Sequence, residues 1–161
     1  MTHTIREADL ANADDCSAIV DVINSYARDE MGGGEALSPD VQARIPAGLR
    51  EHPTTFVLLA FAGDRPVGVA VCFFGFSTFA ARPLLNIHDL AVVPGMRGKG
   101  IGRSLLEAAE AKAVSRGCCK LTLEVRDDNR ARGLYERYGF VDFIVGRSTP
   151  TRFLCKPLGH D

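Results

Sequence analysis

A glycine-dense turn in the middle of the chain constrains the fold most strongly. An apolar run at residues 87–93 predicts a strand, and Pro94-Gly95-Met96 ends it just before Arg97-Gly98-Lys99-Gly100-Ile101-Gly102. From Ile101 onward apolar residues recur at helical spacing. A strand, a turn and a helix in this order aim several backbone N–H groups at one point, and glycines let an anion approach them closely. The stretch therefore predicts a phosphate site, to which Arg97, Lys99 and Arg103 add positive charge.

Two familiar phosphate motifs do not fit this turn. A nucleoside-triphosphate loop requires Gly-Lys-Ser or Gly-Lys-Thr, and neither occurs in the chain. A dinucleotide fold requires Gly-x-Gly-x-x-Gly near the first strand, whereas Gly98-x-Gly100 lies mid-chain and is followed by Arg103 at the third glycine position. Both classes are excluded.

The other elements are predicted from periodicity and turn residues. Helices are expected over residues 14–28, 38–50, 101–117 and 130–138, and strands over 4–6, 54–62, 67–76, 84–93, 120–125, 140–145 and 152–156. Ser38-Pro39 predicts an N-cap and first helical position, and Pro46 is expected to weaken the later half of that helix. This β-α-α-β-β-β-α-β-α-β-β order predicts the α/β (α+β) class with a mixed sheet.

Composition sets broader limits. The chain has 161 residues, which favours a single domain over residues 1–161, and its net charge of −1 argues against a general nucleic-acid or membrane surface. No apolar run is long enough to span a bilayer, and the start of the chain does not resemble a signal peptide. The five cysteines are odd in number and lack Cys-x-x-Cys spacing, so neither a disulfide framework nor a zinc site is expected. A cytoplasmic location is the simplest expectation.

Two sequence blocks carry a family resemblance. Residues 97–102 match Arg/Gln-x-x-Gly-x-Gly/Ala, and residues 121–140 contain Leu-Thr-Leu-Glu124-Val-Arg, Asn129 and then Ala-x-x-Leu-Tyr135-x-x-x-Gly-Phe. Together they resemble the GNAT superfamily of N-acetyltransferases. The segment 73–79 is similar to part of spermidine/spermine acetyltransferase, and the run around Glu124 is similar to that of the ribosomal-protein N-terminal acetyltransferases.

The resemblance implies a fold and a cofactor. The fold is a mainly antiparallel sheet flanked by about four helices, in which the strands at 87–93 and 120–125 splay apart. Acetyl-CoA is the implied co-substrate, with no metal. Its pantetheine arm would pair with the backbone of Leu90, Ala91 and Val92, and the implied pyrophosphate contacts come from Arg97, Gly98, Lys99, Gly100, Ile101, Gly102 and Arg103. Asn129 is one residue closer to the tyrosine than in the family pattern, and we expect it still to reach the CoA arm.

The same resemblance assigns catalytic roles. Tyr135 matches the tyrosine that protonates the departing thiolate. Glu124, His88 and Asp89 are alternative bases for the amine, and a water relay is a further one. Ideal alternation places His88 on one face of its strand and Asp89 on the other, and a bulge would exchange them.

The acceptor is less defined by the sequence. The family implies a primary amine of a small molecule or of a protein terminus, bound near the first two helices, residues 32–37 and residues 73–83. Four acidic side chains either attract a cationic amine or lie on solvated faces: Asp14, Asp15, Asp29 and Glu30. The alternatives are a non-catalytic acyl-CoA-binding or sensory domain and, more remotely, a regulatory protein that binds a partner through its sheet. Many family members dimerise, so the resemblance is compatible with a homodimer.

Overall fold

The computed structural model describes residues 2–146 and 148–159. The chain divides into two compact units, Met1–Leu123 and Glu124–Asp161. Within the described residues, no helix combines the length and the apolar character that crossing a membrane requires.

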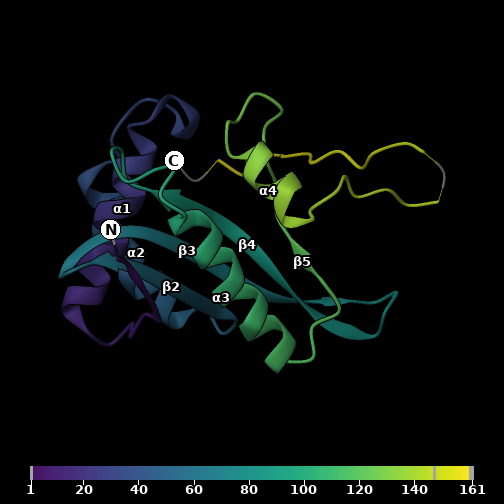
Figure 1. Ribbon diagram of the computed structural model, residues 1–161, viewed down its shortest axis with the longest axis horizontal. Helices are drawn as coiled ribbons and strands as arrows, with labels where there is room; N and C mark the ends of the chain where they lie inside the picture. The colour runs from purple at the N-terminus through teal and green to yellow at the C-terminus, as the bar shows by residue number, and fades with distance from the viewer. Residues whose placement is uncertain (1, 147, 160–161) are drawn as a thin grey trace. The chain divides into compact units, whose positions relative to one another are not determined.

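The first unit is built on a five-stranded sheet with the order β1-β2-β3-β4-β5 (Figure 1). The three neighbouring pairs from β1 to β4 are antiparallel, and β4 pairs with β5 in parallel. The strands are β1 Thr4–Glu7, β2 Thr55–Ala62, β3 Arg65–Ser77, β4 Arg82–Val92 and β5 Leu121–Thr122. The prediction of a mixed, mainly antiparallel sheet is confirmed, although β5 is much shorter than the strand expected over residues 120–125.

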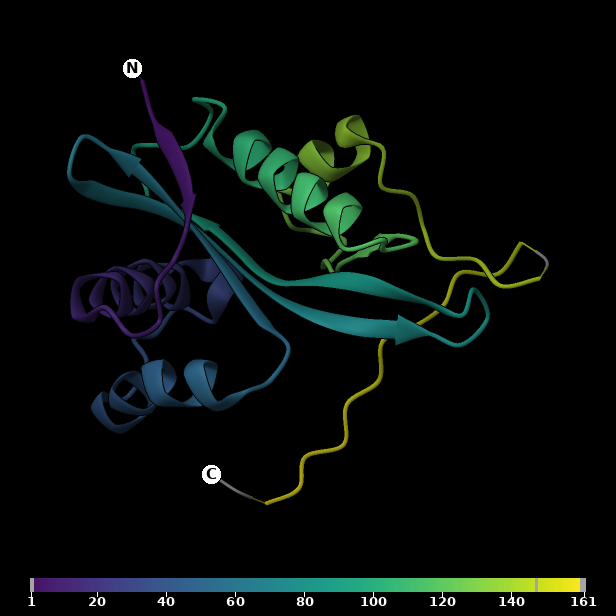
Figure 2. The ribbon, with the colours of Figure 1, turned by 90° about the horizontal axis from the view of Figure 1, so that it is seen from below.

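Helices cover both faces of this sheet. α1 (Ala13–Ala27) and α2 (Pro39–Glu51) lie on one side, and α3 (Ile101–Ser115) lies on the other, as Figure 2 shows. The side chain of Asn12 caps α1, and the Ser38 hydroxyl accepts a hydrogen bond from the N–H of Val41 to cap α2, with Pro39 at the first helical position. The short 3-10 helix η1 (Glu30–Gly32) follows α1. α2 continues through Pro46, so this proline does not end the helix.

The core explains how the helices attach. On one face, three α1 side chains pack against residues of β2, β3 and β4: Ala18, Ile19 and Val22 against Val57, Leu59, Val69, Val71 and Ala91. On the other face, Gly68 of β3 lies beneath α3. A Cβ at Gly68 would be 3.1 Å from Ile101 Cγ2 and 3.2 Å from both Leu105 Cδ1 and the carbonyl oxygen of Ala91. The missing side chain therefore allows the start of α3 to lie close to the sheet.

The second unit contains α4 (Arg132–Tyr138), which ends at Gly139 with φ of 109°. The rings of Tyr135 and Tyr138 pack against Phe140 at centroid distances of 5.9 and 6.2 Å. The strands expected at 140–145 and 152–156 do not form within the described residues, so that prediction was wrong. One isolated bridge joins Ile144 and Pro150. A two-stranded ribbon is marginal without further strands or a packed face, which accounts for the difference.

Candidate functional site

The N-terminus of α3 differs from those of α1 and α2. Its N-cap is Gly100, with φ of 83°, no side chain caps it, and its first turn contains no acidic residue. α1 and α2 each have a side-chain cap, and their first turns contain two acidic residues and one acidic residue respectively. Gly98 also has a positive φ, and a Cβ at either glycine would meet no atom within 4 Å. A helix start that has no side-chain cap and no acidic residue, with open space beside its glycines, is compatible with the anion site that the sequence suggests.

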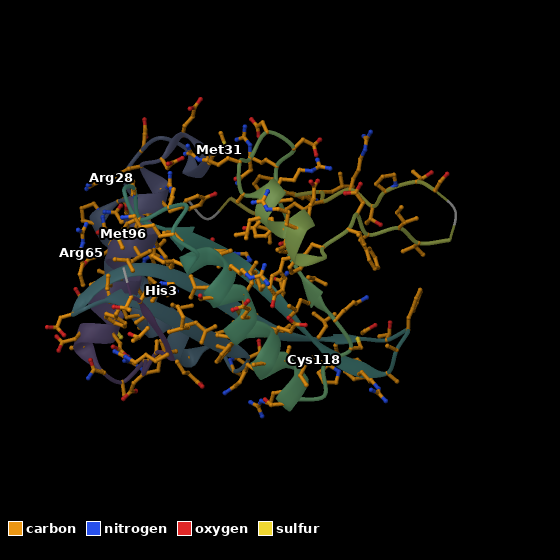
Figure 3. The ribbon with its side chains drawn as sticks, viewed as in Figure 1. His3, Arg28, Met31, Arg65, Met96 and Cys118 are labelled. Atoms are coloured by element: carbon orange, nitrogen blue, oxygen red, sulfur yellow. The ribbon has the colours of Figure 1, made fainter. Side chains whose placement is uncertain are left out.

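The basic side chains of the turn have different environments. The Arg97 guanidinium lies 2.8 Å from Asp29 Oδ2 and also donates through Nε to the carbonyl oxygen of Val92 at 3.0 Å. Arg97 is therefore held in place, and it ties the turn to the segment after α1. Lys99 is exposed, with its Nζ 3.6 Å from the sulfur of the buried Met96, which Figure 3 labels. Arg103 is exposed and pairs with Glu107 at 2.9 Å.

β4 and β5 separate as predicted. Their pairing in the described part of the chain consists of Leu85 with Leu121 and Asn86 with Thr122, whereas β4 continues to Val92. Because backbone groups alternate along an antiparallel strand, the hydrogen bond from Val93 N–H to Val67 O fixes their directions. Leu90 and Val92 direct their N–H and C=O groups toward the open edge. Ala91 directs its N–H and C=O groups toward β3. The expectation that Leu90, Ala91 and Val92 all present backbone groups to the pantetheine arm must therefore be corrected for Ala91.

A β-bulge in β4 brings His88 and Asp89 together. Val71 pairs with Asp89 and Cys72 pairs with Ile87, so His88 is the extra residue without a partner on β3. The sequence left open which of His88 and Asp89 would face the helices. Because the bulge interrupts the alternation, both side chains line the same cavity.

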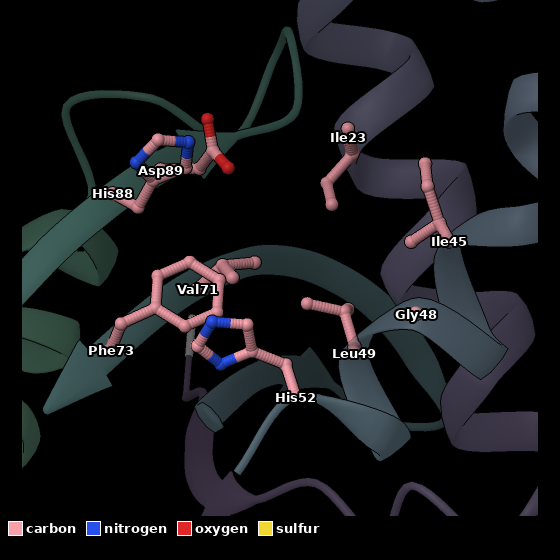
Figure 4. A pocket seen from close by; sticks show the side chains of 9 residues that line it. All are labelled: Ile23, Ile45, Gly48, Leu49, His52, Val71, Phe73, His88 and Asp89. Carbon is pink, nitrogen blue, oxygen red and sulfur yellow. The ribbon is translucent and has the colours of Figure 1, made fainter. Parts of the chain in front are cut away.

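This cavity of about 320 Å³ lies within the first unit (Figure 4). Its lining is mostly apolar and comes from α1, α2, β3 and β4: Ile23, Ile45, Gly48, Leu49, His52, Val71, Phe73, His88 and Asp89. The Phe73 ring packs edge-on against His52 at 4.8 Å and against His88 at 5.6 Å between centroids. Ile23, Ile45 and Leu49 project from the helices toward the strand residues (Figure 4).

Burial changes the acid–base chemistry here. It raises the pKa of the Asp89 carboxyl above its ordinary value, while the neighbouring His88 imidazole acts in the opposite direction. It also raises the pKa of the Cys72 thiol to about 12, and the nearby Asp89 charge adds to this shift. Asp89 contributes a carboxyl group to the cavity lining. Burial there favours the neutral form of this group, compared with the same group in water.

The acidic residues that the sequence offered for attracting an amine lie elsewhere. Asp15 is buried against Arg6 at 2.6 Å, and this guanidinium is the main cause that lowers the pKa of Asp15. Asp29 pairs with Arg97, and neither Asp14 nor Glu30 lines the cavity. Asp15 and Asp29 thus have structural partners, and the cavity's carboxyl group is Asp89.

Sequence reasoning expected the first two helices beside the acceptor but named none of the residues with which α2 lines the cavity. Ile45, Gly48, Leu49 and His52 are spaced i, i+3, i+4 and i+7, which places them on one face of α2. That spacing is the signal that could have found them.

Glu124, Asn129 and Tyr135 belong to the second unit. Glu124 is exposed and Tyr135 is buried. The Asn129 side chain accepts a hydrogen bond from the N–H of Ala131 at 2.8 Å, and the Asp128 carboxylate pairs with Arg126 at 2.8 Å. In the part of the chain that the structure describes, no three His, Cys, Asp or Glu residues form a group that could hold a metal ion.

Comparison with known proteins gives a consistent result. Residues 19–140 match the family described as "Acetyltransferase (GNAT) family". Uncharacterized N-acetyltransferase YhfO of Bacillus subtilis is 32% identical over 136 residues, covering 81% of this chain and 86% of that protein. Thialysine N-epsilon-acetyltransferase of Bos taurus is 31% identical over 147 residues, covering 86% and 84%. The crystal structure of ribosomal-protein-alanine N-acetyltransferase from Brucella melitensis superposes with a TM-score of 0.71 at 21% identity, covering 94% of this chain and all of that one, and supports the fold alone.

Proposed function

The chain belongs to the GNAT acetyltransferase family, and on this premise we propose that it transfers the acetyl group of acetyl-CoA directly to a primary amine. One observation carries the proposal: the uncapped, glycine-rich start of α3 follows β4, whose pairing with β5 in the described residues ends at Asn86 while β4 itself runs on to Val92. An anion site and a strand edge side by side suit a cofactor that has a pyrophosphate and an amide-containing arm.

In this proposal, different residues of the first unit bind the pyrophosphate and the arm of acetyl-CoA. Backbone N–H groups of residues 97–103 hold the pyrophosphate, and Lys99 and Arg103 supply positive charge at its rim. Leu90 and the N–H group of Val92 pair with the arm, and one N–H group of these two residues stabilises the oxyanion that develops on the thioester carbonyl. Arg97 is a positioning residue in this proposal, because Asp29 and the carbonyl of Val92 already hold its guanidinium.

Acetyl transfer requires removal of a proton from the amine and a proton for the thiolate. In the proposed reaction the amine nitrogen bonds to the acetyl carbon, the carbon–sulfur bond breaks, and Tyr135 protonates the sulfur. The cavity beside Asp89 receives the amine, with Asp89 or His88 accepting its proton. Glu124 is the alternative base, and Asn129 is retained as a contact to the CoA arm.

The family match also bears on domain organisation. It runs from residue 19 to residue 140 and so passes through the boundary between the two units at Leu123. This supports the proposal that both units form one catalytic domain. A cytoplasmic location and a homodimer remain predictions.

The test combines binding and turnover. Acetyl-CoA binding is measured by calorimetry, and CoA release is followed with a thiol reagent in the presence of amines. Gly100→Glu places bulk and negative charge in the anion site and should abolish binding, whereas Gly63→Glu, in the turn between β2 and β3, should not. Tyr135→Phe should keep binding and lower kcat roughly 100-fold. Wild-type binding without turnover across a broad amine panel would point to a sensory domain, and no binding would refute the proposed site.

A further inference from the structure

We propose that the cavity beside Asp89 selects a small monoamine with an apolar body, and that Gly48 sets the size of that body. The inference rests on the proposed acetyl transfer and specifies its acceptor. It places the ammonium group of the acceptor beside Asp89 and the rest of the molecule against the walls formed by α1, α2 and Phe73.

The charges of the lining favour an acceptor with one ammonium group. Asp89 is the acidic residue of the lining, and the lining contains neither lysine nor arginine. One carboxylate compensates one ammonium group. A second ammonium, as in a polyamine, would find no second carboxylate in the lining, and a carboxylate, as in an amino acid, would find neither lysine nor arginine there. The cavity therefore favours a single amine over both classes.

The walls of the cavity favour an acceptor with an apolar body. Ile23, Ile45, Leu49, Val71 and Phe73 offer hydrocarbon surface opposite and beneath Asp89 (Figure 4). A volume of about 320 Å³ accommodates roughly ten non-hydrogen atoms, if each is given about the 30 Å³ of a water molecule. An aryl-ethyl or hexyl chain matches this size and gains free energy from burial against those walls.

Gly48 leaves space in the cavity for the acceptor. It lies on the cavity face of α2, one turn from Ile45 and from His52, and it contributes no side chain there. A Cβ at this position would meet no atom within 4 Å, and Gly48 has no positive φ that would strain a larger residue. Part of the cavity therefore exists because position 48 is a glycine.

The first experiment compares acceptors. The rate of CoA release is measured at one pH with 2-phenylethylamine, hexylamine, ethylamine, spermidine and lysine, and mass spectrometry identifies each acetylated product. We expect kcat/KM for the two larger apolar amines to exceed that for spermidine and lysine by about 100-fold, the equivalent of leaving one charge unpaired. Preference for spermidine or lysine overturns the inference while leaving acetyl transfer intact.

The second experiment changes the cavity. Gly48→Leu should raise KM for 2-phenylethylamine at least tenfold more than it raises KM for ethylamine, with Gly48→Ala as the matched control of small size. Both substitutions replace a helical glycine by a better helix former, so the protein should fold at least as well. An unchanged KM for 2-phenylethylamine in Gly48→Leu refutes the assigned role. Loss of acetyl-CoA binding in the wild type would instead refute the proposed function, and with it this inference.

Discussion

The carboxyl group of Asp89 lies where burial disfavours its charged form. Its pKa is raised mainly by burial, with the His88 imidazole opposing this shift and the Cys72 thiol nearby. A carboxyl group whose pKa is raised in the folded state adds stability below its unfolded pKa of about 3.9 and loses that contribution as pH rises through the folded pKa. Asp89 thus lowers the stability of the fold at neutral pH.

This predicts opposite effects of Asp89→Asn on stability and activity. The variant should melt at a higher temperature than the wild type at pH 8, and the difference should shrink toward pH 4, because protonation removes the charge of the wild-type carboxyl as the pH falls. Its kcat/KM for a primary amine should fall about 100-fold, because the proposed partner of the ammonium group is lost. Thermal unfolding at both pH values and CoA-release assays check the two parts. The exposed Asp14→Asn is the control, and equal behaviour of the two variants would contradict the role of Asp89.

Among the elements, α3 depends on close contact with β3. Gly68→Ala would bring a Cβ within 3.2 Å of the Ala91 carbonyl oxygen, a backbone atom that cannot move aside easily, and within 3.1 Å of Ile101. We expect a loss of about 1–3 kcal/mol in the free energy of unfolding. We also expect weaker acetyl-CoA binding, because α3 must shift at the end that is proposed to hold the pyrophosphate.

The matched control lies in the same strand. A Cβ at Gly75 would come within 3.2 Å of the Leu84 side chain, whose end can rotate away. Gly75→Ala should therefore cost less stability than Gly68→Ala and leave acetyl-CoA affinity unchanged. Denaturant unfolding and calorimetry of both variants decide the comparison, and equal losses would argue against the contact between α3 and β3 as the cause.

For the whole molecule, the reactivity of each cysteine thiol depends on whether it lies at the surface or in the core. All five are free thiols, of which Cys119 and Cys155 are exposed and Cys72 is buried. With burial raising its pKa to about 12, Cys72 is neutral and inaccessible in the native state, whereas thiol reagents attack thiolates. We expect Cys119 and Cys155 to react rapidly with such a reagent at pH 8 and Cys72 to react only in denaturant. Mass spectrometry of the labelled peptides identifies the sites, and rapid labelling of native Cys72 would contradict the structure of this strand.

Much of the fold follows from local signals in the sequence. Asn12 and Ser38 are caps that act on neighbouring backbone, so the starts of α1 and α2 could be predicted to within a residue or two. The glycine turn before α3 was predictable for the same reason. The bulge at His88 was not, because it depends on how β3 pairs with β4. The cavity required α2 to be placed against that bulge, which no local pattern specifies. The strands expected after residue 140 depended on long-range pairing, and they do not form in the described residues.

The open edge of β4 has a consequence for handling the protein. Unpaired strand edges recruit strands of other chains, and proteins commonly blunt them with charged side chains. Here the Arg97 guanidinium already occupies the carbonyl of Val92, so one acceptor of the edge is unavailable to an incoming strand. The side chain of Leu90 is uncharged and does not protect the edge in this way. We therefore expect association between copies of the chain to begin at Leu90 at high protein concentration. A ligand that lies along this edge would then act as a solubilising agent as well as a reactant, and concentrated stocks should remain clear longer in its presence.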